Sequence, residues 1–364
     1  MAEFPTTPGE VDTAWLEAQL GQAGLLGDAR ISSFDWVQIG TGQVGDTARF
    51  ALTYDRPCDA PATLAGKFAS ADPTSKGTAA AMSLYVKEVG FYRELAGLIA
   101  VRTPRVHAAE IAEDGADFVL LFEDLAPTRG GNQLDGCALA DAEAAMRQAA
   151  ALHAATRGSP AVLGAAWLHG RDGLLGEIGR LYHQAHVIFR ERYQGILAAD
   201  AMALCEVLDM RVDGFLNRHL PEPGLIHGDF RLDNMLFGVG NGAEPIAIVD
   251  WQTCAVGCGM TDVGYFMGCG IGSELRRPNE MALLDLYAEE MSRRGVLTTR
   301  AGLWNRYRIG ALHGVFTAVF SAAFVARTER GDANFLSMAR GACELALDHD
   351  SIAALDHYTE TGTC

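Results

Sequence analysis

The chain has 364 residues, of which 49% are hydrophobic and 21% charged, and its formal net charge is -17. This composition is that of a globular protein and excludes an extended disordered chain. The acidic charge argues against a nucleic-acid partner, because a polyanion would be repelled. Eight scattered cysteines and a polar amino terminus without a secretory segment predict reduced thiols and a cytoplasmic location.

The first 125 residues predict a tail and a small lobe built around a sheet. Residues 1–30 form the tail, with a helix that Asp12 or Thr13 can cap. Residues 31–125 then change to a strand pattern, in which Asp114–Gly115 is a strong hairpin signal. The expected strands cover residues 34–39, 47–54, 63–68, 106–111 and 117–123, and the expected helix covers residues 78–99. A linker near residues 123–128 ends this lobe.

Residues 126–364 predict a larger, mostly helical lobe, so that the whole chain is expected to have an α+β fold. Residues 309–326 contain no Asp, Glu, Lys or Arg and reach the lower length limit of a bilayer span. Alanine, glycine and polar side chains dilute this stretch, which favours a buried core helix over a span. Other helices are expected at residues 141–156, 174–197 and 200–218 and towards the end, with a short strand pair at 225–237 and 245–250.

The strongest chemical signal is the octapeptide His227–Asn234 (HGDFRLDN), followed by Ile246–Trp251 (IAIVDW). Apolar runs on both sides of the octapeptide predict a polar loop between two strands, which would present Asp229 and Asn234. The second run delivers Asp250 at its end. Phosphoryl transfer needs a carboxylate near the acceptor hydroxyl and hard oxygen ligands for Mg²⁺. The three side chains supply both, although any one acidic residue after a strand could be a simple turn former.

These two segments resemble the catalytic and metal-binding segments of the aminoglycoside phosphotransferase-like kinases. The wording is closest to their broad bacterial branch, which is similar to ecdysteroid kinase-like proteins and to the kinase-like domain of some acyl-CoA dehydrogenases. The resemblance spans about residues 34–297. It implies a protein-kinase-like two-lobed fold, in which the small lobe has a five-stranded antiparallel sheet and one helix and the large lobe is mostly helical.

The resemblance also implies residue roles. Asp229 would be the catalytic base, and Asn234 and Asp250 would bind Mg²⁺. His227 would brace the loop, and Asp262, in the segment after the metal-binding aspartate, would fix it. The Leu-His end of an earlier helix, at His153, would pack against the same loop. Arg231 could steady the transferring phosphate or structure the loop.

The small lobe is expected to hold the nucleotide. Gly40, Gly42 and Gly45 fit the G-x-G-x-x-G pattern, and the strand after them favours a phosphate-covering loop over a dinucleotide fingerprint. A plain glycine hairpin remains the alternative. The segment at residues 122–125 resembles the hinge whose backbone holds adenine, which makes Glu123 and Leu125 candidate contacts.

A lysine and a glutamate in the small lobe are predicted to pair. Lys67 lies in the third strand among apolar residues, and Glu88 lies on the apolar face of the expected helix. A carboxylate on such a face needs a cation to compensate its desolvation. The pair would aim Lys67 at the α- and β-phosphates. Glu94 is the alternative partner, and a simple surface ion pair is the alternative explanation.

Together these observations predict an ATP-dependent kinase, with GTP possible as the donor, that uses Mg²⁺ to phosphorylate a hydroxyl of a small molecule. No nucleic-acid or membrane partner is expected. A second hypothesis is a nucleotide-binding pseudokinase with a regulatory role, which the intact set of Lys67, Asp229, Asn234 and Asp250 disfavours. The acceptor is left open between an aminoglycoside, a sugar, a hydroxyacyl compound and another metabolite.

Other candidate residues have simpler explanations. Cys254, Cys258 and Cys269 lack the close paired spacing of a zinc site and are expected to be buried thiols. His183 and His186 lie one helical turn apart but lack a visible third ligand. The final list contains three residues of the late helices, where the family binds acceptors but ordinary helix-flank roles are favoured: Arg306, Arg308 and His313.

Overall fold

The structure is a computed structural model, and it describes residues 3–40, 44–169, 173–218, 222–324 and 327–362. The chain divides into two compact units. The small unit contains residues 1–97, 103–127 and 249–253, and the large unit contains residues 98–102, 128–248 and 254–364. The predicted glycine position 42 lies outside the described residues.

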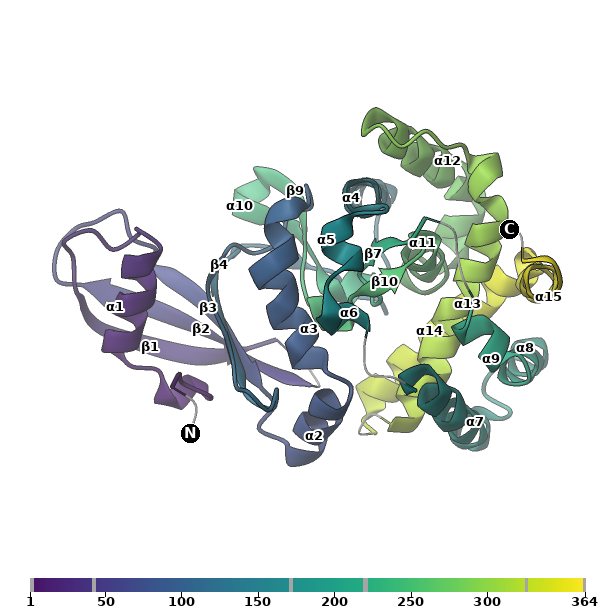
Figure 1. The fold of residues 1–364 in the computed structure, drawn as a ribbon, viewed down its shortest axis with the longest axis horizontal. Helices are drawn as coiled ribbons and strands as arrows, with labels where there is room; N and C mark the ends of the chain where they lie inside the picture. The colour runs from purple at the N-terminus through teal and green to yellow at the C-terminus, as the bar shows by residue number, and fades with distance from the viewer. Residues whose placement is uncertain (1–2, 41–43, 170–172, 219–221, 325–326, 363–364) are drawn as a thin grey trace. The chain divides into compact units, whose positions relative to one another are not determined.

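The small unit is built on one five-stranded antiparallel sheet, as predicted (Figure 1). Its strand order is β1-β2-β3-β5-β4. Gly115 has a φ of +70° in the tight turn between β4 and β5, which confirms the hairpin. The strands are β1 (Ile31–Ile39), β2 (Gly45–Tyr54), β3 (Thr63–Ala69), β4 (Val106–Ile111) and β5 (Phe118–Glu123).

Alternation of side chains along the strands gives the sheet two different faces. On one face, Leu64 and Phe68 of β3 pack in a core with Leu16 and Leu20 of helix α1 (Thr13–Gln22). Asp12 caps this helix by accepting a hydrogen bond from the Trp15 amide. The residue between Leu64 and Phe68 that points to the opposite face is Lys67. The sheet therefore directs this lysine away from the α1 core.

The single helix predicted at residues 78–99 is wrong in detail, because the segment is broken. Helix α2 (Pro73–Ala81) ends before Ser83, whose φ of +57° interrupts the helical path. Helix α3 (Leu84–Gly90) then continues through a π-helical turn, η2 (Phe91–Leu95), and a 3-10 turn, η3 (Ala96–Leu98). A serine in the left-handed region carries no strong sequence signal. The break leaves α3 as a short separate element that carries Glu88.

The large unit is mostly helical, as predicted, with two small sheets. The sheets have the orders β10-β7 and β6-β8-β9, and all their pairs are antiparallel. The strands are β6 (Arg129–Gly130), β7 (Gly224–Ile226), β8 (Met235–Gly238), β9 (Glu244–Ile248) and β10 (Ala255–Gly257). Short helical turns are η1 (Pro8–Glu10) in the small unit, η4 (Leu232–Asn234), η5 (Trp251–Thr253) and η6 (Phe266–Gly270). The remaining helices are α4 (Leu139–Thr156), α5 (Pro160–Leu163), α6 (Ala166–His169), α7 (Leu174–Tyr193), α8 (Ala199–Asp209), α9 (Val212–Leu216), α10 (Val239–Gly242), α11 (Met260–Tyr265), α12 (Gly272–Arg293), α13 (Arg300–Phe324), α14 (Glu329–Asp348) and α15 (Ser351–Thr361).

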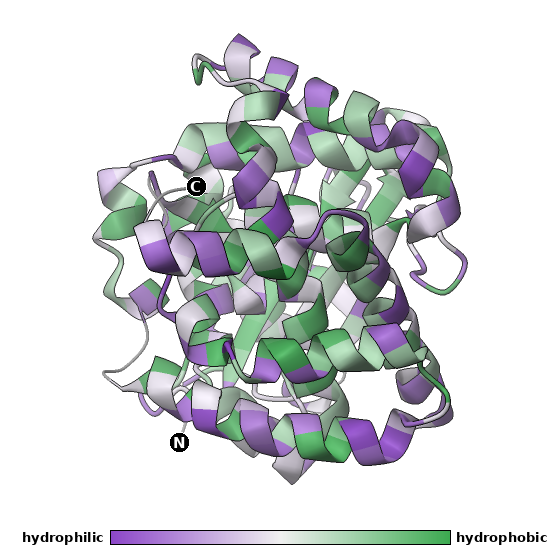
Figure 2. Cartoon of the chain, turned by 90° about the vertical axis from the view of Figure 1, so that its right-hand side faces the viewer, coloured by the Kyte–Doolittle hydropathy of each residue, from purple (hydrophilic) through white to green (hydrophobic). Residues whose placement is uncertain are grey.

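Helix α13 is the centre of the large unit, which confirms the prediction of a buried core helix. Its apolar side chains, among them Leu312, Val315 and Val319, are completely buried in one core with residues of α7, α8 and α14. Across the described residues, no helix combines the length and the apolar character that a membrane crossing requires. Figure 2 shows hydrophilic and hydrophobic residues alternating along the helices on the visible side of this unit.

Glycines allow the helices of the large unit to cross closely. An ideal Cβ on Gly310 of α13 would lie 2.0 Å from the Met260 carbonyl oxygen at the start of α11. A Cβ on Gly264 of α11 would lie 2.5 Å from the Ala311 amide nitrogen. Real Cβ atoms do not approach backbone atoms this closely. The two helices therefore meet along their glycines, and this contact fixes α11 against α13.

Gly310→Ala is expected to destabilise the protein by about 1–3 kcal/mol or more, because the added methyl group would force two backbones apart. Thermal or urea denaturation followed by circular dichroism measures this. Gly302→Ala in the same helix is the matched control, since its nearest outside atom, Thr299 Oγ1, lies at 3.5 Å. The control is expected to be neutral or to stabilise by up to about 1 kcal/mol. Equal effects of the two substitutions would contradict this interpretation of the crossing.

Candidate functional site

The octapeptide forms the predicted loop between strands β7 and β8 of the large unit. Gly228 has a φ of +81°, a conformation that glycine adopts without strain. The Asn234 side-chain amide then donates to the backbone oxygen of Asp229 and to its Oδ2, both at 2.8 Å. These two hydrogen bonds close the loop on itself. They bring together Asp229 and Asn234, as the sequence predicted.

The Asp229 carboxylate is held by three side chains. Arg231 Nε donates to Oδ1 at 2.9 Å and to Oδ2 at 3.1 Å, and the Tyr265 hydroxyl donates to Oδ1 at 2.8 Å. Burial by itself raises the pKa of Asp229, but the Arg231 charge and the Tyr265 hydrogen bond outweigh it, so that this pKa lies below its usual value. Asp229 is therefore an ionised carboxylate at neutral pH, in a position fixed on several sides.

Arg231 is committed to two carboxylates of its own loop. Besides Asp229, it donates through its NH1 to Asp233 Oδ2 at 2.7 Å. Asp233 in turn accepts from the Gln133 amide at 3.0 Å. The Arg231 side chain is 19% exposed, and the two anions raise its pKa despite burial. This geometry supports the loop-structuring alternative for Arg231.

A buried aspartate fixes the backbone of the loop from below. Asp262 of α11 is completely buried and accepts from the His227 amide at 2.7 Å and from the Gly228 amide at 2.9 Å. Its Oδ2 also lies 3.1 Å from His153 Nε2. The roles that the sequence suggested for Asp262 and for His153, at the end of α4, are thus both present as hydrogen bonds.

Two residues of this site were missed or undervalued by the sequence reasoning. Tyr265 is completely buried and donates to Asp229, yet it was read only as part of the segment Gly257–Phe266. His313 of α13 had been assigned an ordinary helix-flank role. Its Nε2 lies 2.9 Å from the Gly228 carbonyl oxygen, which can only accept, so Nε2 carries the proton. Its absence of charged neighbours within the apolar stretch 309–326 was the available signal.

A second charged group lies in the small unit, around Lys67. The Lys67 Nζ atom is 2.7 Å from Glu88 Oε2 and 2.9 Å from Asp250 Oδ1. The predicted pair of Lys67 and Glu88 is therefore present, while the alternative partner Glu94 is exposed. Burial raises the pKa of Glu88 to about 7 against the attraction of Lys67. Burial acts to lower the pKa of Lys67, but its two carboxylate partners raise it above the usual value.

Asp250 reaches this group through an unusual backbone conformation. Its φ is +66°, in the left-handed region, where such non-glycine residues often mark functional positions. The next residue, Trp251, is completely buried and stacks on Phe91 with ring centroids 3.9 Å apart and planes 5° apart. The stack anchors residues 249–253 on the π-helical turn that follows α3. Asp250 consequently shares Lys67 with Glu88.

The glycine segment is described on both sides of residues 41–43. Gly40 has a φ of +75°, and a Cβ on Gly45 would lie 3.1 Å from the Phe68 carbonyl oxygen and 3.3 Å from Lys67 Cε. A side chain at position 45 would thus crowd the lysine. The Tyr85 hydroxyl of α3 donates to the Val44 carbonyl at 2.7 Å. These contacts tie the end of the segment to the element that carries Glu88.

At the end of β5, the two predicted hinge residues have structural contacts. Glu123 Oε1 accepts from the Arg105 amide at 2.7 Å, and the Glu123 amide donates to the Arg105 carbonyl at 2.9 Å. Leu125 is buried. Asp124 between them forms a two-bond ion pair with Arg49. The Glu123 and Asp124 side chains are therefore engaged within the small unit, which leaves nucleotide contact to the backbone.

The weaker candidates are used mainly in packing. Arg308 donates to the His349 and Asp350 carbonyl oxygens, where α14 ends and α15 begins. His183 Nδ1 lies 2.8 Å from Asp209, and His186 lies 3.5 Å from the same carboxylate. The three cysteines proposed as thiols rather than zinc ligands, Cys254, Cys258 and Cys269, are buried. Within the described ranges, no three His, Cys, Asp or Glu side chains are arranged to hold a metal ion by themselves.

Comparison with known proteins followed from this geometry. The model of a family described as the phosphotransferase enzyme family matches residues 69–297, which is more than half of the chain. No curated protein matches the sequence significantly.

Solved structures share the fold at low sequence identity. A provisionally assigned aminoglycoside phosphotransferase of Ralstonia eutropha JMP134 has a TM-score of 0.55 and 18% identity, over 93% of this chain and 98% of that chain. For a microcompartment-associated aminopropanol kinase the values are 0.54 and 18%, over 94% and 99%. Aminoglycoside 2'-phosphotransferase-IIIa, in its GDP complex, gives 0.50 and 15%, over 97% and 100%. The predicted protein-kinase-like two-lobed α+β fold is confirmed.

Proposed function

Because the chain belongs to the phosphotransferase enzyme family, we propose that it transfers the terminal phosphoryl group of ATP or GTP to a hydroxyl of a small molecule. The observation that carries the proposal is the buried Lys67, which is shared by Glu88 and Asp250. A lysine held between two carboxylates is fixed in position and keeps its positive charge. Such a cation is suited to orient nucleotide phosphates.

In this proposal, the loop of the large unit acts on the acceptor. Asp229 accepts a hydrogen bond from the acceptor hydroxyl and takes its proton as the bond to phosphorus forms. The ionised state of Asp229 supports this role, because only the carboxylate can take a proton. Arg231 and Tyr265 hold the carboxylate in place. Catalysis then rests mainly on positioning and on neutralising phosphate charge.

The residues available for Mg²⁺ are Asn234 and Asp250. The Asn234 amide nitrogen donates twice to Asp229, which leaves its side-chain oxygen for a cation. Asp250 Oδ2 has a long hydrogen bond of 3.3 Å from Gln252, and its side chain is 29% exposed. Both are hard oxygen donors of the kind that Mg²⁺ prefers, and phosphate oxygens and water commonly complete such sites. The ion would neutralise charge on the phosphates.

A direct test is to incubate the purified protein with ATP or GTP and Mg²⁺ and panels of hydroxylated metabolites, sugars, aminoglycosides and hydroxyacyl thioesters. Phosphorus NMR is expected to show a new phosphate ester with at least one acceptor class. Acceptor-free hydrolysis of the nucleotide is measured in parallel. Nucleotide binding without hydrolysis or ester formation would favour the pseudokinase hypothesis and contradict the proposal.

Tyr265→Phe should change the pH dependence of the reaction. The hydrogen bond from Tyr265 lowers the pKa of Asp229, so its removal raises this pKa. The base must be deprotonated, and the acidic limb of the profile of kcat/KM against pH is therefore expected to move to higher pH. Rates between pH 4 and 9 measure the limb. A lower rate with an unmoved limb would show that Tyr265 only supports the structure.

A further inference from the structure

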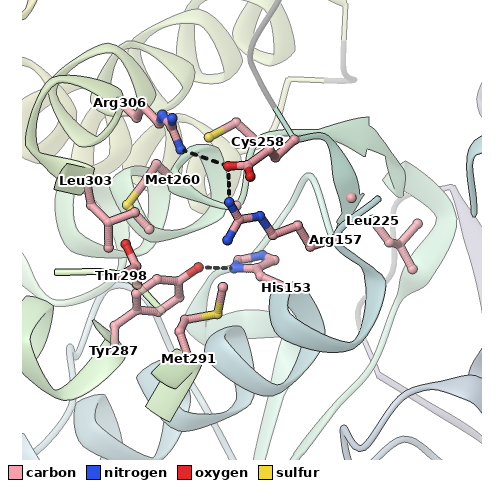
Figure 3. A pocket seen from close by; sticks show the side chains of 13 residues that line it. His153, Arg157, Leu225, Cys258, Met260, Tyr287, Met291, Thr298, Leu303 and Arg306 are labelled. Atoms are coloured by element: carbon pink, nitrogen blue, oxygen red, sulfur yellow. Dashed lines mark hydrogen bonds and ion pairs between the residues drawn. The ribbon is translucent and has the colours of Figure 1, made fainter. Parts of the chain in front are cut away.

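The large unit contains a cavity of about 60 Å³ that is separate from the proposed catalytic residues (Figure 3). Its described lining residues do not include Asp229, Arg231 or Asn234. The walls come from the end of α4, from β7, from the start of α11, and from α12 and α13. Gly259 makes room for one wall, because a Cβ there would lie 2.5 Å from His153 Nδ1. The cavity is thus built by close packing of several elements.

One end of the cavity is cationic. Figure 3 shows the guanidinium groups of Arg157 and Arg306 converging on one carboxylate, that of Glu222. Arg157 forms an ion pair with it, whereas Arg306 NH1 lies 3.9 Å from Glu222 Oε2. Arg306 Nε is buried and has no hydrogen-bond partner among the described residues. Two guanidinium groups thus share one carboxylate, and one donor is left unsatisfied.

The other side of the cavity is apolar. Leu225, Met260, Met291 and Leu303 line it, next to the Tyr287 ring. Methionine side chains adapt their shape to small ligands. A phosphate ion would turn some of its oxygens towards these apolar groups, where they would lack donors. A carboxylate with a short apolar tail instead matches both ends, since guanidinium groups bind carboxylates through paired hydrogen bonds.

We propose that this cavity binds a small monocarboxylate with a short aliphatic tail, and that the Glu222 side chain occupies the carboxylate position in its absence. Glu222 has a φ of +57°, which is strained for a residue of this type. Its side chain is 50% exposed, so it can leave Arg157 and Arg306 for solvent. A ligand carboxylate would replace it and supply the missing acceptor for Arg306.

The test uses the full-length protein without nucleotide, so its result does not depend on the proposed reaction. Butyrate, butan-1-ol, butylamine and inorganic phosphate are titrated at constant ionic strength by calorimetry and thermal denaturation. Butyrate alone is expected to bind saturably and to raise the melting temperature. Equal binding of butan-1-ol would show a purely apolar cavity, and stronger binding of phosphate would show a different anion site. Either result, or no saturable butyrate binding, overturns the proposal.

Three variants separate the roles of the charged residues. Arg306→Gln is expected to weaken butyrate binding at least about tenfold, while Arg300→Gln in the same helix, outside the cavity lining, leaves it unchanged. Glu222→Gln is expected to tighten binding about threefold or more, because the internal competitor is lost. Weaker or unchanged binding by Glu222→Gln would contradict the displacement. This variant keeps the test decisive even if Arg306→Gln does not fold.

Discussion

Asp229→Asn is expected to reduce kcat by about 10²–10⁴, which is the usual contribution of a general base. The amide has nearly the same shape as the carboxylate but cannot take the proton of the acceptor hydroxyl. The Arg231 and Tyr265 donors that now hold Asp229 would keep only one acceptor oxygen. Steady-state kinetics with the acceptor found by the phosphorus NMR screen measures the effect, and a melting curve checks the fold.

Asp233→Asn is the matched control for this prediction. It lies in the same loop and also pairs with Arg231, and its side chain is 22% exposed against 20% for Asp229. A partly exposed ion pair contributes about 0–1 kcal/mol, so the control should lose less than about tenfold in kcat. If Asp229→Asn kept full activity, or if both variants lost activity equally, the assignment of the base would be wrong.

Asp250→Asn is expected to lower kcat/KM by about 10²–10³, because loss of a metal ligand removes several kcal/mol of charge stabilisation. The Mg²⁺ concentration for half-maximal activity should rise at the same time. The substitution suits the backbone, since asparagine readily adopts the positive φ of +66° found at this position. Activity is measured as a function of Mg²⁺ at fixed nucleotide concentration.

Asp117→Asn provides the control for Asp250→Asn. Asp117 also pairs with a lysine of the small unit, Lys76, and its side chain is 29% exposed, as is that of Asp250. Its substitution removes the same charge from a similar environment but should leave the Mg²⁺ dependence unchanged. An unchanged Mg²⁺ dependence in Asp250→Asn itself would remove this residue from the proposed metal site.

The sequence predicted the parts of the site that depend on local pattern. Alternation in the strands, and the apolar runs around the octapeptide, were sufficient to place Lys67 in β3 and Asp229 in a loop. The pairing of Lys67 with Glu88 followed because a carboxylate on an apolar face needs a cation. These inferences use residues whose roles are set within one or two neighbouring elements.

The parts that sequence could not predict depend on distant contacts. His313 and Gly228 are separated by 85 positions, and their contact arises because α13 is packed tightly on the segment that begins α11, at Gly310. Tyr265 reaches Asp229 through the same packing. The break at Ser83 was missed because a left-handed serine is decided by its surroundings rather than by a turn motif. Tertiary packing overrides local preference at each of these positions.

The small unit is discontinuous along the chain, since residues 249–253 belong to it although they follow 121 residues of the large unit, from 128 to 248. Recombination that exchanged only the first 127 residues between two homologues would therefore combine a lysine from one parent with an aspartate and tryptophan from the other. Lys67 and Asp250, and likewise Phe91 and Trp251, must be inherited as matched sets. A functional chimera consequently needs a second, five-residue graft at positions 249–253.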